Sequence, residues 1–406
     1  MSTEPVERDR HPYRWVMLAG VSGVYFSFGL VMTAIAPVVA VVGRDLGLSK
    51  TALGSALGCW QLVYVGMAIP GGAFIDRFGV RPALFLAGVT IALSGVLRAT
   101  STGYVSLLLA VGVFGIGGPL LSVGAPKLVQ TWFSGRDRGL AIGIYMSSVG
   151  LGSMASLALT QSVVMPWLDD SWRAVLVAYA CVALVSAFAW ALVAHHPLSR
   201  AAQVEDRARE GTAAGTYAAL LRMPIVQSVL MLALGTFMFS HGIINWLPEA
   251  LRSAGLTATA AGNWAALSTG VGVVAALIVP ALATPDRRTP ILVALLLLAG
   301  ASLFLLDPSH RGAFGVGLVA LGTARACITP IALLLLMESP RIGARHMAAA
   351  GALFFTSGEI GGALGPFLFG AIADQSGFDR SLQCWAGLAM LLIVVVLRMR
   401  KHAHPS

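Results

Sequence analysis

The stretch Gly71-Gly72-Ala73-Phe74-Ile75-Asp76-Arg77-Phe78-Gly79-Val80-Arg81-Pro82 joins two apolar segments, near residues 52–74 and 82–99. Both segments are close to the length of about 20 residues that a helix needs to cross the hydrocarbon core of a bilayer. The stretch between them carries an aspartate and two arginines and is rich in glycine. It is therefore expected to form a short charged turn at the membrane surface between two spanning helices.

The composition of the whole chain supports a membrane protein. Hydrophobic residues make up 57% of the sequence and charged residues only 11%, whereas soluble domains carry about 25% charged residues. Apolar runs of roughly spanning length predict twelve transmembrane helices, near residues 14–40, 52–74, 82–99, 104–130, 139–165, 173–195, 224–248, 261–283, 289–306, 313–337, 347–373 and 382–398. The sequence thus predicts an all-α integral membrane protein.

The distribution of positive charge predicts the orientation. If the amino terminus is cytoplasmic, 18 of the 27 Lys and Arg residues fall in inside segments and 7 in outside segments, with Lys127 and Arg325 inside spans. Positively charged residues prefer the cytoplasmic side of a membrane protein, so both termini are expected in the cytoplasm of a multi-pass cell-membrane protein. This topology explains the net charge of +9 without a nucleic-acid partner, and no basic stretch is interleaved with aromatic residues as a strand-binding groove would require.

The chain divides into two similar halves. The most charged segment, residues 196–222, is expected to be a cytoplasmic linker between a bundle of six spans at 1–195 and a second bundle of six at 223–406. Pro70 precedes Asp76 by six residues, and Pro280 precedes Asp286 by the same six. A repeat of this kind is typical of transporters built from two pseudo-symmetric bundles.

The charged turn resembles the signature of the major facilitator superfamily, which reads roughly G-x-x-x-D-R-x-G-x-R between the second and third spans. The matching positions are Gly72, Asp76, Arg77, Gly79 and Arg81. The resemblance implies a secondary transporter that works by alternating access, with two bundles rocking around a site near the middle of the membrane. It also implies that these five residues and the nearby Arg138 act in gating.

The gating role has a physical basis. Asp76, at the inner end of the second span, could meet the positively polarised amino end of the eleventh span after Arg345. Arg77, Arg81 and Arg138 would complete this charge cluster. Such a contact would favour the outward-open state.

In the resembled fold, spans one, four, seven and ten line a central cavity. Arg325 falls near the middle of the tenth span among small and apolar neighbours. A guanidinium at that depth costs at least about 2.5 kcal/mol, so it is expected to face a wet cavity or a partner. Since arginine binds carboxylates and planar oxyanions in two-pronged fashion, Arg325 is predicted to bind an anionic substrate, with a structural ion pair as the alternative.

Further polar groups lie at a suitable depth. Tyr25, Gln61 and Tyr64 could offer hydrogen bonds to a substrate. Glu359, in the eleventh span, could carry a coupling proton, because burial favours the protonated form of a carboxylic acid, or it could pair with Arg325. Lys127 is expected to reach the inner interface or to draw anions inward. His241, Asn245 and Trp246 are expected near the outer end of the seventh span, in an interfacial belt or an external gate.

The predicted function is transport of a small organic or inorganic anion, coupled to protons, by a protein that is not an enzyme. The chain has some resemblance to bacterial cyanate, nitrate or nitrite porters and to monocarboxylate carriers, through Pro126-Lys127 and Asn245-Trp246-Leu247-Pro248. It departs from the nitrate carriers in lacking arginines in spans two and eight. The alternative is a proton-driven exporter of drugs or hydrophobic compounds, in which Arg325 would be structural.

Other function classes lack support in the sequence. No cluster of nucleophile and base or of metal ligands appears, no G-x-x-x-x-G-K-[ST] phosphate-binding motif occurs, and the four cysteines fall within predicted spans without metal-like spacing. We therefore expect no cofactor and no metal. The expected partners are a small-molecule substrate and membrane lipid, and the chain is expected to be a monomer.

Overall fold

The computed structural model describes residues 11–197, 217–337 and 343–403, and every regular element in these ranges is helical. The first half contains α2 (Tyr13–Met32), η1 (Ala36–Val38), α3 (Val39–Leu46), α4 (Lys50–Phe78), α5 (Val80–Ala99), α6 (Tyr104–Trp132), α7 (Gly135–Leu159), η2 (Thr160–Val164), α8 (Met165–Trp167) and α9 (Trp172–Ala194). The second half contains α11 (Tyr217–Leu221), α12 (Pro224–Ser253), α13 (Ala258–Leu282), α14 (Arg288–Leu303), α15 (Arg311–Met337) and α16 (Gly343–Ala403).

The helices account for the twelve expected spans. Within the described residues, ten helices are long and apolar enough to cross a membrane, and α14 is a shorter apolar helix. The longest, α16, is in fact two helices, because Gly377 between them has φ +83° and ψ 170°, a conformation that glycine adopts without strain. Counting α16 as two and including α14 gives twelve apolar helices in the described part of the chain.

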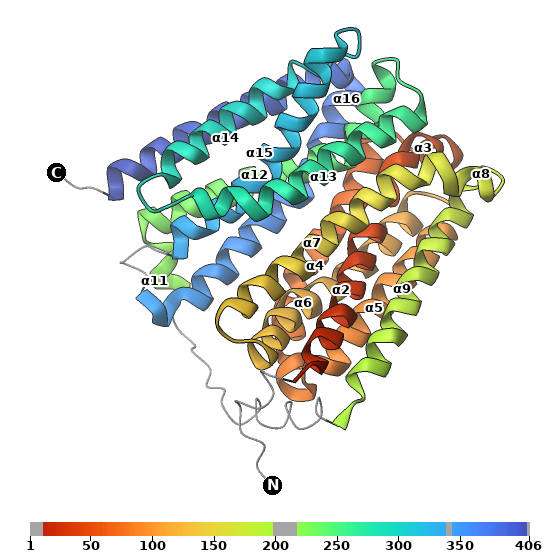
Figure 1. Ribbon diagram of the computed structural model, residues 1–406. Helices are drawn as coiled ribbons and strands as arrows, with labels where there is room; N and C mark the ends of the chain where they lie inside the picture. Colours follow the sequence, from red (N-terminus) through yellow and green to blue (C-terminus); the bar gives the residue numbers. More distant parts are fainter. Residues whose placement is uncertain (1–10, 198–216, 338–342, 404–406) are drawn as a thin grey trace.

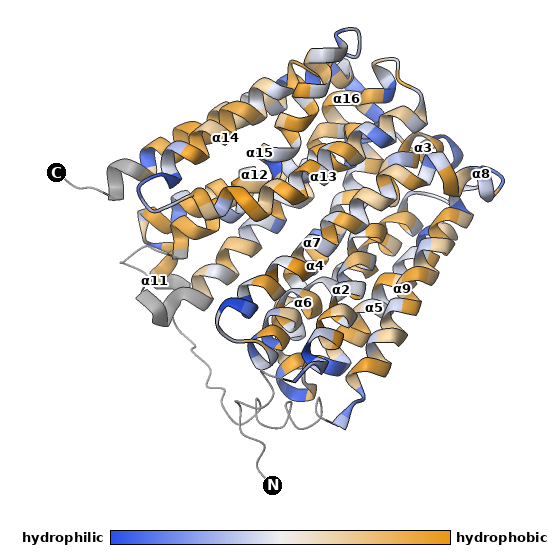
Figure 2. Ribbon diagram, in the orientation of Figure 1, coloured by the Kyte–Doolittle hydropathy of each residue, from blue (hydrophilic) through white to orange (hydrophobic). Residues whose placement is uncertain are grey.

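The twelve helices form two bundles. In the first, α2 packs against α7 and α9, and α5 packs against α6 and α9; in the second, α12 packs against α16, and α13 and α14 pack against α15. Figure 1 shows the two bundles side by side, the first in warm colours and the second in green and blue. Figure 2 shows that hydrophobic residues cover the helices along their length and that hydrophilic residues gather at the helix ends, as expected for a protein surrounded by lipid.

The predicted linker falls mostly on residues 198–216, which lie outside the described residues. The described part of that segment includes the short helix α11, which contacts α12 and α16.

The bundles meet mainly through two helix pairs, α4 with α16 and α7 with α13. Along the first pair the backbones touch, since a Cβ atom at Gly54 or Gly58 of α4 would collide with the carbonyl of Pro366 or Ala363 of α16. Small residues allow such close approach of transmembrane helices. We call this contact the α4–α16 seam.

The two ends of the molecule differ. We call the end with the Lys50 and Asp374 contact the Asp374 end, and the end with the turn from Asp76 to Arg81 the Asp76 end. The seam joins the bundles at the Asp374 end, whereas toward the Asp76 end α4 carries exposed residues such as Ile69, with 85% of its surface exposed. Figure 1 shows the same arrangement, with the ribbons close together near α3 and diverging toward the end where the first helix begins.

A buried cation marks the break in the first span. After Met32 the chain leaves the α-helix and continues through η1 and α3. Arg98 of α5 is only 1% exposed, and its guanidinium donates to the carbonyl of Val31 at 2.9 Å and to Ser94 Oγ at 3.1 Å. A cation is favoured at the carbonyl end of a helix, so Arg98 stabilises the end of α2. It is part of the protein interior rather than a loop charge.

Candidate functional site

A cavity of about 310 Å³ lies between the bundles. It receives side chains from α2, α4, α6 and α7 of the first bundle and from α12, α15 and α16 of the second. Its lining residues are Tyr25, Phe28, Met32, Trp60, Tyr64, Gly118, Leu121, Ser122, Val149, Ser240, His241, Ile244, Arg325, Phe355 and Glu359. A largely apolar pocket with a few converging polar groups is the usual form of a small-molecule site.

Arg325 brings a positive charge to this cavity. It lies on α15 one turn after Gly322, where α15 and α13 come into backbone contact because a Cβ at Gly322 would collide with the Ser268 carbonyl. Its guanidinium is 3.5 Å from Thr269 Oγ1 of α13. Among the described residues no carboxylate lies within ion-pair distance of Arg325, so the structural ion pair that the sequence left open is not formed in this conformation.

Glu359 brings an acidic group to the same cavity. It lies on α16 and is only 7% exposed, and its Oε2 atom has no hydrogen-bond partner among the described residues. It shares the cavity with Arg325 without forming an ion pair with it. A carboxyl group in this position can accept a hydrogen bond or exchange a proton with a molecule that enters the cavity.

Of the three residues predicted to offer hydrogen bonds to a substrate, two line the cavity and one lies beside it. Tyr25 and Tyr64 line the cavity, where Tyr25 donates to the Leu121 carbonyl at 3.0 Å and the Tyr64 hydroxyl is 2.7 Å from Ser122 Oγ. Gln61, by contrast, is fully buried in the α4–α16 seam next to the cavity. Its Nε2 is 3.1 Å from His241 Nδ1 and 3.3 Å from the Gly362 carbonyl.

His241 was expected near the outer end of its span, but it lines the cavity. Its ring lies 5.8 Å from the Trp60 ring and 6.0 Å from the Phe237 ring. The only signal in the sequence was that His241 is a histidine within a predicted span. Sequence reasoning did not place it, or the hydroxyls of Ser122 and Ser240, at the cavity, because it could not assign the helix faces.

The expectation of an interfacial belt at Asn245 and Trp246 is wrong. Both side chains are buried, at 6% and 1% exposure. Trp246 donates from Nε1 to the Pro366 carbonyl at 2.9 Å, and Asn245 donates to the His241 carbonyl at 2.8 Å. Trp246 thus packs α12 against α16, and the Asn245 amide bonds within its own helix, so neither side chain faces the membrane surface.

The signature turn holds the residues predicted to act in gating. Gly79, between α4 and α5, has φ +89° and donates its N–H to the Ile75 carbonyl at 2.7 Å. Gly72 has open space where a Cβ would lie. The Arg81 carbonyl accepts from Trp190 Nε1 at 3.0 Å, and the Arg77 guanidinium lies 5.3 Å from the Phe78 ring. Glycine is needed at Gly79, since a side chain is strained at this φ.

Two charged residues near this turn, Asp76 and Arg138, have contacts with α6 of the first bundle or its end. Asp76 lies 3.7 Å from Lys127 Nζ of α6. Arg138 donates from Nε to the Phe133 carbonyl at 2.9 Å, at the end of α6. The expected partner of Asp76, the amino end of the eleventh span around Arg345, falls among residues whose side chains lie outside the described part of the structure. Lys127 is 19% exposed and is thus an ion-pair partner rather than a solvated surface lysine.

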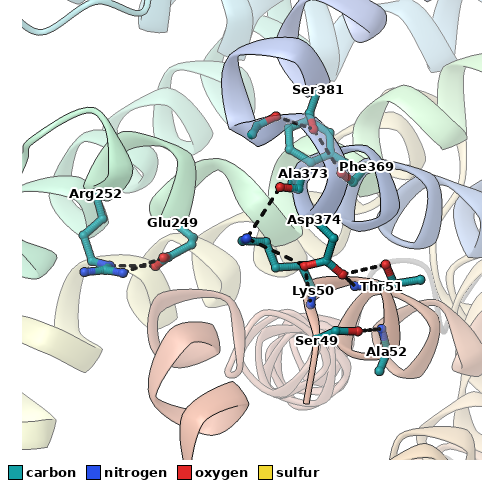
Figure 3. A network of polar contacts seen from close by, with 11 residues as sticks. Ser49, Lys50, Thr51, Ala52, Glu249, Arg252, Phe369, Ala373, Asp374 and Ser381 are labelled. Carbon is teal, nitrogen blue, oxygen red and sulfur yellow. Dashed lines mark hydrogen bonds and ion pairs between the residues drawn. The ribbon is translucent and has the colours of Figure 1, made fainter. Parts of the chain in front are cut away.

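At the opposite end, a second polar network joins the bundles (Figure 3). The Asp374 carboxylate of α16 accepts from the backbone N–H groups of Lys50 at 3.0 Å and Thr51 at 2.7 Å, at the first turn of α4. It also accepts from Thr51 Oγ1 at 2.6 Å and lies 3.7 Å from Lys50 Nζ. An anion at the amino end of a helix satisfies free N–H groups and the helix dipole, so this contact stabilises closure of the Asp374 end.

Comparison with known proteins identifies the class. A sequence model of the Major Facilitator Superfamily matches residues 21–366. A D-galactonate transporter of Escherichia coli O6:H1 is 24% identical over an alignment of 396 positions, which covers 87% of this chain and 87% of that protein. A hexuronate transporter of Bacillus subtilis (strain 168) is 31% identical over 146 residues, which are 36% of this chain and only 34% of that protein.

Solved structures agree in fold. A bacterial homolog of the human lysosomal transporter Spinster, in an inward-facing and unoccupied conformation, has a TM-score of 0.76 to this chain. The two chains are 17% identical over 97% of this chain and 99% of that one, which defines the fold alone. The family match and the transporter relatives indicate a transporter and not an enzyme. The chain belongs to the major facilitator superfamily.

Proposed function

We propose that this transporter moves a small organic anion by alternating access, with coupling to protons. The observation that carries the proposal is Arg325, a guanidinium at a cavity between the bundles with no carboxylate within ion-pair distance among the described residues. A cation is costly at this depth in a membrane, and an anionic ligand would offset that cost. Hexuronate and galactonate, the substrates in the names of two relatives, are sugar carboxylates, which makes this class the first to test.

The rest of the cavity suits a ligand of this kind. Tyr64, Ser122 and Ser240 supply hydroxyl groups at its wall, and such groups can exchange hydrogen bonds with the hydroxyls of a sugar acid. The apolar rings of Phe28 and Trp60 cover the remaining surface. A carboxylate at Arg325 would thus fix one end of the ligand, and the hydroxyl side chains would select its body.

Glu359 is the proposed site of proton coupling. It shares the cavity with Arg325, and its Oε2 is buried without a hydrogen-bond partner among the described residues. An ionised carboxylate in such a place would pay a large desolvation cost, so it would take up a proton when the cavity is dry. Binding of an anion at Arg325 would further favour the neutral form of Glu359, which links the two ligands thermodynamically.

The proposed cycle uses the difference between the two ends. With the amino terminus in the cytoplasm, as the positive charges predict, the Asp374 end faces outward and the conformation described here is closed to the outside. Opening that end requires α4 to separate from α16, and closing the Asp76 end completes the exchange. The proposed units are the bundles at 1–195 and 223–406 with the linker 196–222 between them, acting as a monomer in the lipid of the cell membrane.

The test compares wild-type protein with Arg325→Ala and Arg325→Lys in reconstituted vesicles. We expect uptake of one or more small carboxylates by the wild type, and Arg325→Ala should weaken binding by about tenfold to a hundredfold, since hydrogen bonds to charged groups contribute about 1.5–3 kcal/mol. Arg325→Lys keeps the charge but loses the two-pronged geometry and should retain part of the affinity. Arg98→Lys is the matched control, because Arg98 is a buried arginine that does not line the cavity.

The alternative is export of hydrophobic compounds. Its support is the ring-rich wall of the cavity, with Phe28, Trp60 and Phe355 among its residues. Binding of hydrophobic cations that is unchanged in Arg325→Ala, together with no carboxylate binding by the wild type, would favour this alternative and reject the anion carrier.

A further inference from the structure

The amide of Gln61 connects three helices from both bundles at the inner end of the α4–α16 seam. From α4, its Nε2 is 3.1 Å from His241 Nδ1 of α12 and 3.3 Å from the Gly362 carbonyl of α16. Gln61 is fully buried. The polar contacts of the seam therefore run from Asp374 at the surface to His241 at the wall of the cavity.

The positions of the neighbouring groups determine which atoms donate and which accept in this contact. The amide nitrogen carries two hydrogens, one for the Gly362 carbonyl and one for His241. The opposite amide orientation would set Oε1 against the Gly362 carbonyl oxygen, so the hydrogen-bond network assigns Nε2 to the position that faces Gly362 and His241. His241 Nδ1 must then accept, which places the ring proton on Nε2 and makes the imidazole neutral.

The absence of a side chain at Gly362 leaves room for Gln61 and His241 to meet. A Cβ atom at Gly362 would lie 3.1 Å from His241 Cδ2 and 3.3 Å from Gln61 Cγ, tighter than an ordinary contact. Gln61 Oε1 is buried without a hydrogen-bond partner in the described part of the chain. Leaving such an oxygen unpaired costs about 1–3 kcal/mol, so an apolar side chain would pack more favourably here if packing were the only role.

We propose that Gln61 and His241 form the inner latch of the Asp374 end, which ties closure of the seam to a residue at the cavity wall. The pair joins the bundles only while the seam is closed. A ligand that contacts His241 therefore acts on the latch as well. The inference rests on the proposed alternating-access cycle, but it requires neither an anionic substrate nor proton coupling.

The test measures the two conformations directly, without any ligand. Spin labels at Thr102→Cys and Ser376→Cys, both exposed at the Asp374 end, one in each bundle, report its opening in a background without the four native cysteines. A second pair at Ser134→Cys and Thr284→Cys reports the Asp76 end. The distance distributions give the ratio of open to closed populations.

We expect Gln61→Leu and His241→Phe each to shift this ratio about fivefold toward an open Asp374 end, the effect of about one net hydrogen bond. The double variant should shift it no further than Gln61→Leu alone, because that variant already removes the contact with His241. Ser55→Ala is the matched control on α4, since within the described residues the Ser55 hydroxyl contacts Ala52 and Tyr104 of its own bundle and no others, and it should leave the ratio unchanged.

The latch is rejected if both single variants keep the wild-type ratio, or if their effects multiply in the double variant. Having two single variants guards against one that does not fold. Failure of the latch with intact carboxylate binding at Arg325 would leave the proposed function in place, whereas loss of carboxylate binding with an intact latch would reject the anion site alone.

Discussion

Asp374 accepts hydrogen bonds from both the backbone N–H and the hydroxyl of Thr51, at 2.7 Å and 2.6 Å. The two residues belong to different bundles, so each of these bonds breaks when the bundles separate at this end. The side chain of Asp374 is 25% exposed, which leaves water ready to replace the lost bonds. A contact of this kind can therefore stabilise the closed conformation without making its opening very costly.

Asp374→Ala should open this end of the molecule. The substitution leaves the first N–H groups of α4 without their carboxylate, and loss of a capping group costs about 1 kcal/mol, which corresponds to about a fivefold change in the ratio of open to closed populations. The spin-label pair at Thr102 and Ser376 measures it. Ser376→Ala in an otherwise native protein, with exposed Ser376 outside this network, serves as a control for thermal stability. An unchanged distance distribution would show that the cap does not hold the end closed.

Glu359→Gln should abolish proton-driven accumulation of substrate but preserve substrate exchange. The amide keeps the size of the side chain but cannot release a proton, so the variant should still exchange labelled for unlabelled substrate across a vesicle membrane. Accumulation driven by a pH gradient should fall to the equilibrium level. If Glu359→Gln vesicles accumulate substrate as the wild type does, the coupling proton is carried elsewhere.

Gly79→Ala and Gly72→Ala should have different effects on the melting temperature, although both glycines belong to the signature. Gly79 has φ +89°, where a side chain costs about 1–3 kcal/mol, so its substitution should lower the melting temperature. Gly72 is helical with open space around it, and alanine favours a helix by about 1 kcal/mol, so its substitution should not lower the melting temperature. Thermal unfolding in detergent distinguishes the two. Equal destabilisation by the two substitutions would contradict the conclusion that the backbone conformation at Gly79 requires glycine.

Asp76→Asn should slow transport without weakening substrate binding. The Asp76 side chain is 59% exposed beside Lys127, and an ion pair this open contributes at most about 1 kcal/mol, so thermal stability should change little. The proposed gating role requires the charge when the Asp76 end closes, and uptake should therefore fall. Initial uptake rates and equilibrium binding, measured on the same preparation, give the two readings. Loss of binding in a folded protein would argue against gating.

The membrane class, the apolar helices and the charged turn could be predicted from the amino-acid sequence. These properties follow from local physics: apolar length decides what can span a bilayer, and Gly79 permits a backbone conformation that other residues disfavour. Because charge is costly in hydrocarbon, the positions of Arg325 and Glu359 within apolar spans already indicate a functional site.

The contacts between side chains of different helices could not be predicted in this way. Helices that are apolar on all sides have no clear polar face, so periodicity could not tell that His241 lines the cavity or that Trp246 packs against Pro366. The contacts of Gln61 with His241, and of Asp374 with Thr51, join residues 180 and 323 positions apart. Such contacts depend on how two bundles dock, and no local pattern in the sequence specifies that docking.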